Sequence, residues 1–98
     1  MSNTMLTADA PVARTRPDFT HVSDVMLYDI ARHTASLLIA ELIARTDAAT
    51  DESDREQWEA RLRLVDEQVA ALNPDDRAGL IAQNEAWDDE SHALRDRA

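Results

Sequence analysis

A chain of 98 residues forms one small domain, which excludes a large enzyme with a deep cleft. One glycine and three prolines leave few residues for tight hairpin turns, which excludes an all-β sandwich or barrel. The chain has twenty acidic residues and only ten basic ones, all of them arginine, so its formal charge is −10. Direct binding to a nucleic-acid backbone would work against that field.

Cysteine is absent, which removes disulfide frameworks, thiolate zinc sites and thiol nucleophiles, and favours the cytoplasm as the compartment. Residues 1–17 mix polar residues and prolines with a few apolar ones, and they lack the apolar core of a secretory signal. The charge-free stretch at 33–40 is far shorter than the roughly 20 residues of a membrane span. We therefore expect a cytoplasmic protein that has no membrane partner.

Domain organisation follows from the same composition. Residues 1–17 contain Pro11 and Pro17 and no apolar period, so they predict a disordered tail. Residues 18–98 contain 19 acidic residues and 8 arginines, which gives a net charge of −11. The acidic character therefore belongs to a single domain at 18–98.

The first helix is predicted at about 21–46, capped by Asp18 or Thr20. Its apolar residues cover more than one narrow stripe, so one partner helix cannot cover them all. Either this helix is central and packs against two others, or part of its surface is a dimer interface. The residues we assign to that interface are Val25, Leu27, Tyr28, Ala35, Ile39 and Leu42.

The second helix is predicted at about 53–72. Ser53 and Glu56, three residues apart, form the pattern of a capping box. The apolar positions that follow have the spacing of an a/d seam in a helical bundle. They are Trp58, Leu62, Val65, Val69 and Leu72.

The third helix is predicted at about 74–95, with Asn73 as the N-cap and Pro74 at the first helical position. A very short loop would join it to the second helix as a hairpin. Gly79 costs about 1 kcal/mol relative to alanine, which indicates close approach of a neighbouring backbone. The seam is less apolar than that of the second helix: Leu80, Ile81, Asn84, Trp87, Ser91 and Leu94.

These elements predict an all-α protein, a small three-helix antiparallel bundle in which a helical hairpin packs on a long central helix, and which dimerises into a larger bundle. The deepest burial is expected at seven apolar positions. They are Ile30, Leu38, Leu42, Leu62, Val65, Val69 and Leu80.

No residue pattern predicts catalysis. Asp29 and His33 are four residues apart and share a helix face, but such a pair is typically surface decoration, and no glycine-flanked serine elbow lies near any histidine. A single glycine excludes a glycine-rich phosphate loop. We expect no catalytic residue and no cofactor.

Two carboxylate pairs offer an alternative, a small Mg²⁺-dependent hydrolase or an accessory subunit of a larger enzyme. Glu56 with Glu59 and Glu85 with Asp88 have the same spacing on helices that run antiparallel, and hard oxygen ligands suit Mg²⁺. Four-helix nucleotide pyrophosphohydrolases use a similar arrangement, but the surrounding apolar residues do not match, and we set that resemblance aside. A hairpin turning near residue 73 also sets Glu56 opposite Glu90 rather than Glu85. A solvated acidic face is the simpler explanation, because a chain with 20 acidic residues produces such pairs by chance.

The same register places Trp58 and Trp87 side by side at the open end of the hairpin. Tryptophan is enriched at binding hot spots, although core packing is its commoner role. Trp87 precedes Asp88, Asp89 and Glu90, and an aromatic anchor ringed by carboxylates suits a basic protein. Trp58 and residues 87–90 are thus our predicted partner-binding set.

The leading functional hypothesis is a non-enzymatic, acidic protein–protein interaction module that binds a basic protein. Inhibitors, antitoxins and immunity proteins, and adaptors, share this physical description, because a short acidic helical protein can cover a cationic nucleic-acid site. The analogy is one of physical type and not of sequence. A third hypothesis is an assembly subunit whose first helix docks into another chain.

Overall fold

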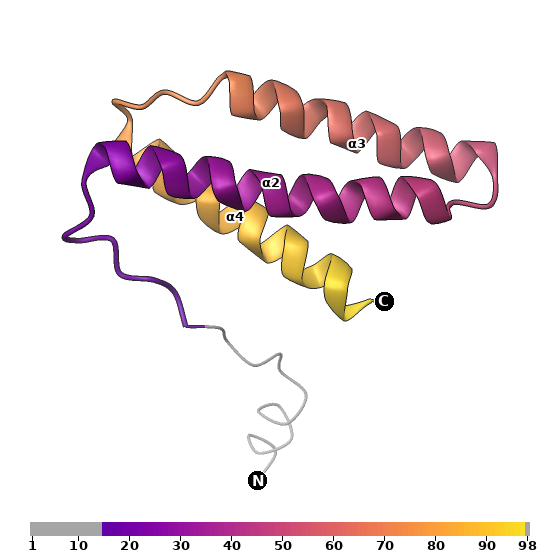
Figure 1. Cartoon of the computed structure of the whole chain (residues 1–98), viewed down its shortest axis with the longest axis horizontal. Coiled ribbons are helices and arrows are strands. Elements are labelled where there is room, and N and C mark those ends of the chain that lie inside the picture. Colours follow the sequence, from indigo (N-terminus) through magenta and orange to yellow (C-terminus); the bar gives the residue numbers. More distant parts are fainter. Residues whose placement is uncertain (1–14, 98) are drawn as a thin grey trace, which may run out of the picture.

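The computed structural model describes residues 15–97, which fold into three helices. These are α2 (Asp24–Ala48), α3 (Glu52–Ala70) and α4 (Arg77–Asp96), and the described part of the chain contains no strand (Figure 1). The all-helical, three-helix prediction is confirmed. The predicted disordered tail falls mostly outside the described residues; its last three residues, 15–17, are exposed and belong to no helix or strand.

Each helix begins at a side-chain cap. The Ser23 hydroxyl accepts a hydrogen bond from the amide of Met26 at 3.1 Å, and the Asp51 carboxylate accepts one from the amide of Asp54 at 2.7 Å. Asp76 caps α4 in the same way. Such caps satisfy amides that have no partner within the helix.

The predicted caps at Asp18 or Thr20 and at Ser53 were wrong. Asp18 instead closes a local turn, because its carboxylate accepts hydrogen bonds from the amide and the hydroxyl of Thr20. These two bonds lower the pKa of Asp18, since they favour its charged form. Asp51, two residues before Ser53, is the N-cap of α3, so Ser53 lies inside the first turn of the helix.

The predicted cap at Asn73 was also wrong, and the loop before α4 is longer than expected. The Asn73 side chain accepts from the amide of Asp75 at 2.9 Å and forms a turn, so α4 begins only after Asp76. From this start Arg77 donates to the carbonyls of Phe19 and Val22, which ties the segment before α2 to α4.

Gly79 has a different role from the one its sequence predicted. A Cβ atom at this position would meet the carboxylate of Asp76, the cap of its own helix, rather than a neighbouring backbone. The glycine therefore leaves room for the cap to fold over the first turn of α4.

α2 lies in the middle of the bundle, with α3 on one side and α4 on the other (Figure 1). α3 runs antiparallel to α2. α4 runs in the same direction as α2, because Arg77 pairs with Asp24 at one end and Arg45 bonds the Leu94 carbonyl at the other. The central placement of the first helix is confirmed. The close hairpin was wrong, because the backbones of α3 and α4 both pack on α2 and do not contact each other.

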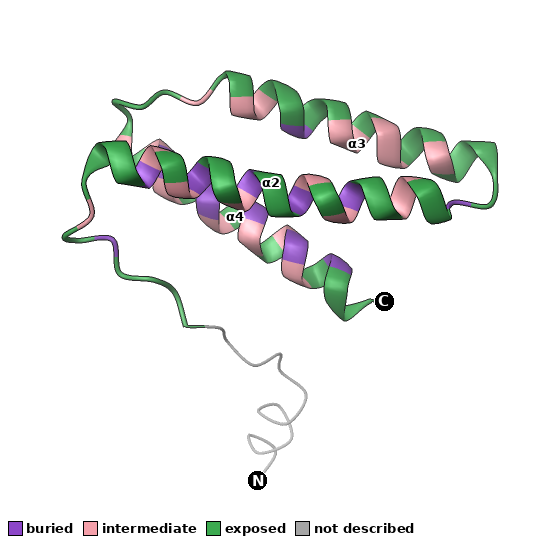
Figure 2. Cartoon of the chain, viewed as in Figure 1, coloured by how far each residue is buried: buried purple, intermediate pink, exposed green. Residues whose placement is uncertain are grey.

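The core lies along α2 and α4 (Figure 2). Four of the seven positions predicted to be most buried, Leu38, Leu42, Val65 and Leu80, are at most 1 % exposed. The other three are half-buried. The core also takes in residues that the prediction did not place among the most buried: Phe19, Leu27, Ala31, Ala35, Trp87 and Leu94.

Candidate functional site

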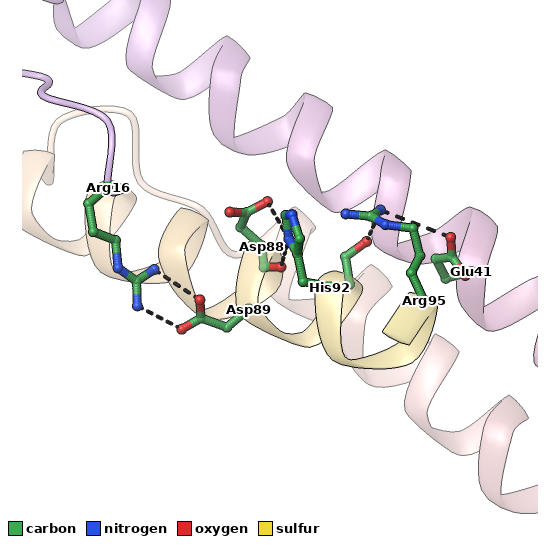
Figure 3. A network of polar contacts seen from close by, with 7 residues as sticks. Arg16, Glu41, Asp88, Asp89, His92 and Arg95 are labelled. Atoms are coloured by element: carbon green, nitrogen blue, oxygen red, sulfur yellow. Dashed lines mark hydrogen bonds and ion pairs between the residues drawn. The ribbon is translucent and has the colours of Figure 1, made fainter. Parts of the chain in front are cut away.

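The acidic run on α4 is engaged by basic side chains of this same chain. Arg16 donates two hydrogen bonds of 3.0 Å to the Asp89 carboxylate (Figure 3), and Arg61 of α3 pairs with Glu90. Asp88 lies 3.4 Å from a ring nitrogen of His92. Each carboxylate of the predicted ring therefore contacts a side chain of the same chain.

The electrostatics of the two arginine pairs agree with this geometry. The hydrogen bond with Asp89 raises the pKa of Arg16, and the hydrogen bond with Glu90 raises the pKa of Arg61. Arg61 and Glu90 are each about 30 % exposed, so water screens this pair less than the exposed pair of Arg16. Arg61 thus holds α3 to α4 across the gap between their backbones.

A polar network continues from α4 to α2 (Figure 3). Arg95 donates to the buried Ser91 hydroxyl at 2.9 Å and lies 4.0 Å from the Glu41 carboxylate. Arg45 reaches the Leu94 carbonyl from the other direction. Glu41 and Arg45 of α2 are therefore directed toward α4.

The two tryptophans are separated, which corrects the prediction that they lie side by side. Trp87 is fully buried, and its indole nitrogen donates to the Gln68 side chain at 3.3 Å. Trp58 is half-buried beneath Arg45, whose guanidinium carbon lies 6.0 Å from the ring centroid. The longer loop shifts the register, so that Gln68 rather than Glu59 meets Trp87. Trp87 is therefore a core residue and not a surface anchor.

A shallow hollow of about 310 Å³ opens between α3 and α4 beside Trp58. Leu94 and Ala93 contribute apolar surface, while the Arg61–Glu90 pair closes one end. The hollow exists because α3 and α4 diverge. Of the two predicted anchors, Trp58 is the one that borders an accessible surface.

The carboxylates of α3 differ from those of α4. Five of them are not within ion-pair distance of any basic side chain in residues 15–97: Asp54, Glu56, Glu59, Asp66 and Glu67. The helical spacing of Glu56 and Glu59 sets them on the side of α3 away from Arg61 and Gln68, the two residues that reach α4. α3 thus carries an acidic flank, which we define as Glu56, Glu59, Asp66 and Glu67. The exposed Arg63 lies on the same face, four residues from Glu59 and from Glu67, but forms no ion pair with either.

The alternative metal set is not assembled. Across the described residues, no group of three or more histidine, aspartate or glutamate side chains is arranged to hold a metal ion. Glu56 and Glu59 face away from α4, so they do not meet Glu85 and Asp88.

The dimer residues predicted on the first helix are mostly used within the chain. Leu27, Ala35 and Leu42 are at most 1 % exposed, because α3 and α4 cover both flanks of α2. Tyr28 and Ile39 are half-buried, and Val25 is 75 % exposed. Three large apolar side chains outside the predicted set are exposed on α2: Met26, Leu37 and Ile43.

The pair of Asp29 and His33 borders a hollow of about 350 Å³ beside Ser36 and Val69. Both side chains are exposed, and no hydrogen bond or ion pair joins them. The arrangement provides no base held beside a nucleophile.

Comparison of the chain with protein-family models, with curated proteins and with solved structures gives no match. None of the three helices has both the length and the apolar run needed to cross a bilayer, as judged over residues 15–97.

Proposed function

We propose that this protein is a non-enzymatic interaction module that binds a basic protein partner, as inhibitors, antitoxins and immunity proteins do. The observation that supports it best is the acidic flank of α3, whose four carboxylates are exposed or half-buried and form no ion pair with an arginine of the described chain, Arg63 on the same face included. Carboxylates that are not paired within the protein are available to arginine or lysine side chains of another.

The charge distribution favours α3 over α4 as the binding surface. The carboxylates of the predicted run at 88–90 already contact Arg16, Arg61 and His92, so a partner would have to replace these contacts. The acidic flank has no such contacts to break. A chain with a net charge of −10 also attracts cationic proteins from a distance and speeds their encounter.

The proposal also includes self-association through α2 and a cytoplasmic setting. Exposed leucine and isoleucine side chains on α2 are available to a second copy, and a chain without cysteine suits a reducing compartment. Self-association would leave α3 accessible, because the exposed face of α2 is distinct from the acidic flank.

A binding measurement with a cationic peptide tests the proposal. A labelled oligoarginine peptide is titrated with the protein, and anisotropy is read at about 20 mM and about 150 mM salt. We expect the variant Glu56→Gln/Glu59→Gln/Glu67→Gln to raise the Kd about tenfold or more and to reduce its dependence on salt.

The matched control removes the same charge elsewhere. The variant Asp29→Asn/Asp75→Asn/Asp96→Asn neutralises three exposed carboxylates on α2, the loop and α4. It is expected to change the Kd less than about threefold. Equal weakening by both variants would mean that the peptide responds to net charge alone, and the α3 surface would be rejected.

A further inference from the structure

One face of α2 is covered by neither α3 nor α4. Helical spacing places seven exposed residues on it, from residue 33 to residue 47. They are His33, Ser36, Leu37, Ala40, Ile43, Ala44 and Asp47. Leu37 and Ile43 are 47 % and 46 % exposed, so two large apolar side chains remain in water. We call this surface the outer face of α2.

Between His33 and Asp47 the outer face carries no acidic side chain and no arginine. Glu41 and Arg45 lie in the same stretch but reach Arg95 and the Leu94 carbonyl of α4. Between residues 33 and 47, two copies can therefore approach without bringing carboxylates together, while Asp29 lies one turn before His33 on the same stripe of the helix.

The spacing of the outer face suits a helix–helix seam. His33, Ser36, Ala40, Ile43 and Asp47 follow one another at intervals of 3, 4, 3 and 4, and the seam is about 21 Å long. Small side chains at Ser36, Ala40 and Ala44 allow two backbones to approach closely.

The sequence of the face is complementary to itself when reversed. With a two-fold axis at Ala40, Leu37 of one chain meets Ile43 of the other, and Ser36 meets Ala44. His33 then falls opposite Asp47, and symmetry repeats each pair. A parallel pairing would set Asp47 against Asp47.

We infer that two copies of this chain pack antiparallel through the outer face of α2, with the two-fold axis at Ala40. The inference rests on the proposed self-association and specifies its surface and its register. It replaces the interface predicted from sequence, whose apolar residues are largely occupied by α3 and α4.

Cysteine cross-linking reads the register directly, because the natural chain contains no cysteine. Ala40→Cys is expected to form a disulfide-linked dimer under mild oxidation. A mixture of Ser36→Cys and Ala44→Cys is expected to give mixed dimers, whereas Ser36→Cys alone is not. Ala60→Cys, on the exposed side of α3, serves as the control and is expected to stay monomeric after denaturation.

Matched charge insertions test the surface. Ile43→Glu is expected to raise the dimer Kd about tenfold or more by light scattering, while Leu64→Glu, at a position 43 % exposed on α3, is expected to leave it unchanged. Circular dichroism checks that both variants keep their helices.

The outcomes separate the two proposals. A monomer at concentrations of about 100 μM overturns self-association and the register together. A dimer that cross-links through Ser36→Cys alone, or that Leu64→Glu disrupts, overturns the antiparallel α2 pairing and leaves self-association standing. Peptide binding by the acidic flank is measured separately and depends on neither result.

Discussion

α3 and α4 are nearly equal in length, but they occupy the bundle very differently (Figure 2). α3 has the more regular apolar seam, and yet Val65 is its one buried residue. α4 has the more polar seam and buries five residues: Leu80, Asn84, Trp87, Ser91 and Leu94. A regular apolar pattern therefore predicts that a helix forms and which face it buries, but not how deeply that face is buried.

The polar groups explain how α4 reaches this depth. Ser91 is paired with Arg95, and the indole of Trp87 is paired with Gln68 across the gap to α3. Buried polar atoms with partners carry little cost. α3 lies along one flank of α2, and its outward side carries carboxylates that remain in water.

The largest expected difference between the two helices concerns their tryptophans. Trp87→Ala removes a fully buried indole from α4 and is expected to cost about 3 to 5 kcal/mol of unfolding free energy, enough to unfold much of the protein. Trp58→Ala removes a half-buried ring and is expected to cost about 2 kcal/mol. Urea unfolding followed by circular dichroism measures both.

Trp87→Phe keeps part of the buried volume and serves as the milder variant if the alanine variant does not fold. A cost for Trp58→Ala equal to or above that for Trp87→Ala would contradict the assignment of the deeper core to α4.

The sequence predicted the three helices and part of the core because helical periodicity is a local property. Leu38, Leu42 and Leu80 could be assigned to the interior in this way. The caps were harder, because several capping residues compete within a few positions. Asn73 and Asp76 both suit an N-cap, and the choice of Asp76 coincides with the contacts of Arg77 to the segment before α2.

The candidate sites were less predictable, because they depend on register between helices. The loop between α3 and α4 is a few residues longer than expected. Trp87 therefore contacts Gln68 instead of the predicted Glu59, and Arg61 lies beside Glu90. Arg16 lies 73 residues before Asp89, and no local pattern indicates that pair. The outer face of α2 emerged only when the positions of α3 and α4 showed which apolar residues were covered.

A smaller effect is expected from Asn84, the polar seam residue of α4 whose side-chain oxygen is buried without a partner. A buried acceptor of this kind costs about 1 to 3 kcal/mol. Asn84→Leu, which keeps the number and branching of side-chain heavy atoms, is expected to stabilise the protein by about 1 kcal/mol where the larger methyl groups fit, which corresponds to a rise in Tm of about 4 to 8 °C.

Ser91→Ala is the control at the neighbouring polar seam position, where the hydroxyl does have a partner. It is expected to lower the Tm slightly. If Asn84→Leu lowers the Tm as well, the amide contributes to the native packing, and the buried oxygen does not destabilise α4.

The smallest expected effect is the change in unfolding free energy when one carboxylate of each helix is replaced by glutamine. We expect this change to have opposite signs in α4 and α3. Glu90→Gln breaks the pair with Arg61, which is partly screened by water, and is expected to destabilise the protein by about 0.5 to 1 kcal/mol. Glu67→Gln removes a carboxylate near the C-terminus of α3, where the last turn has no basic residue. Negative charge is unfavourable at that end of a helix, so the same substitution is expected to stabilise by about 0.3 kcal/mol.

Thermal unfolding at low and high salt measures both variants. Both effects should shrink toward zero as salt is added, because both are electrostatic and at least partly exposed to solvent. Because both variants replace glutamate by glutamine, helix propensity changes equally in the two. An opposite sign of the two stability changes therefore results from the different surroundings of the two carboxylates. Destabilisation by Glu67→Gln of the same size as by Glu90→Gln would show that Glu67 has a stabilising partner in the folded chain. The acidic flank of α3 would then be committed within the protein, as the run on α4 is, and would not be available to a basic partner.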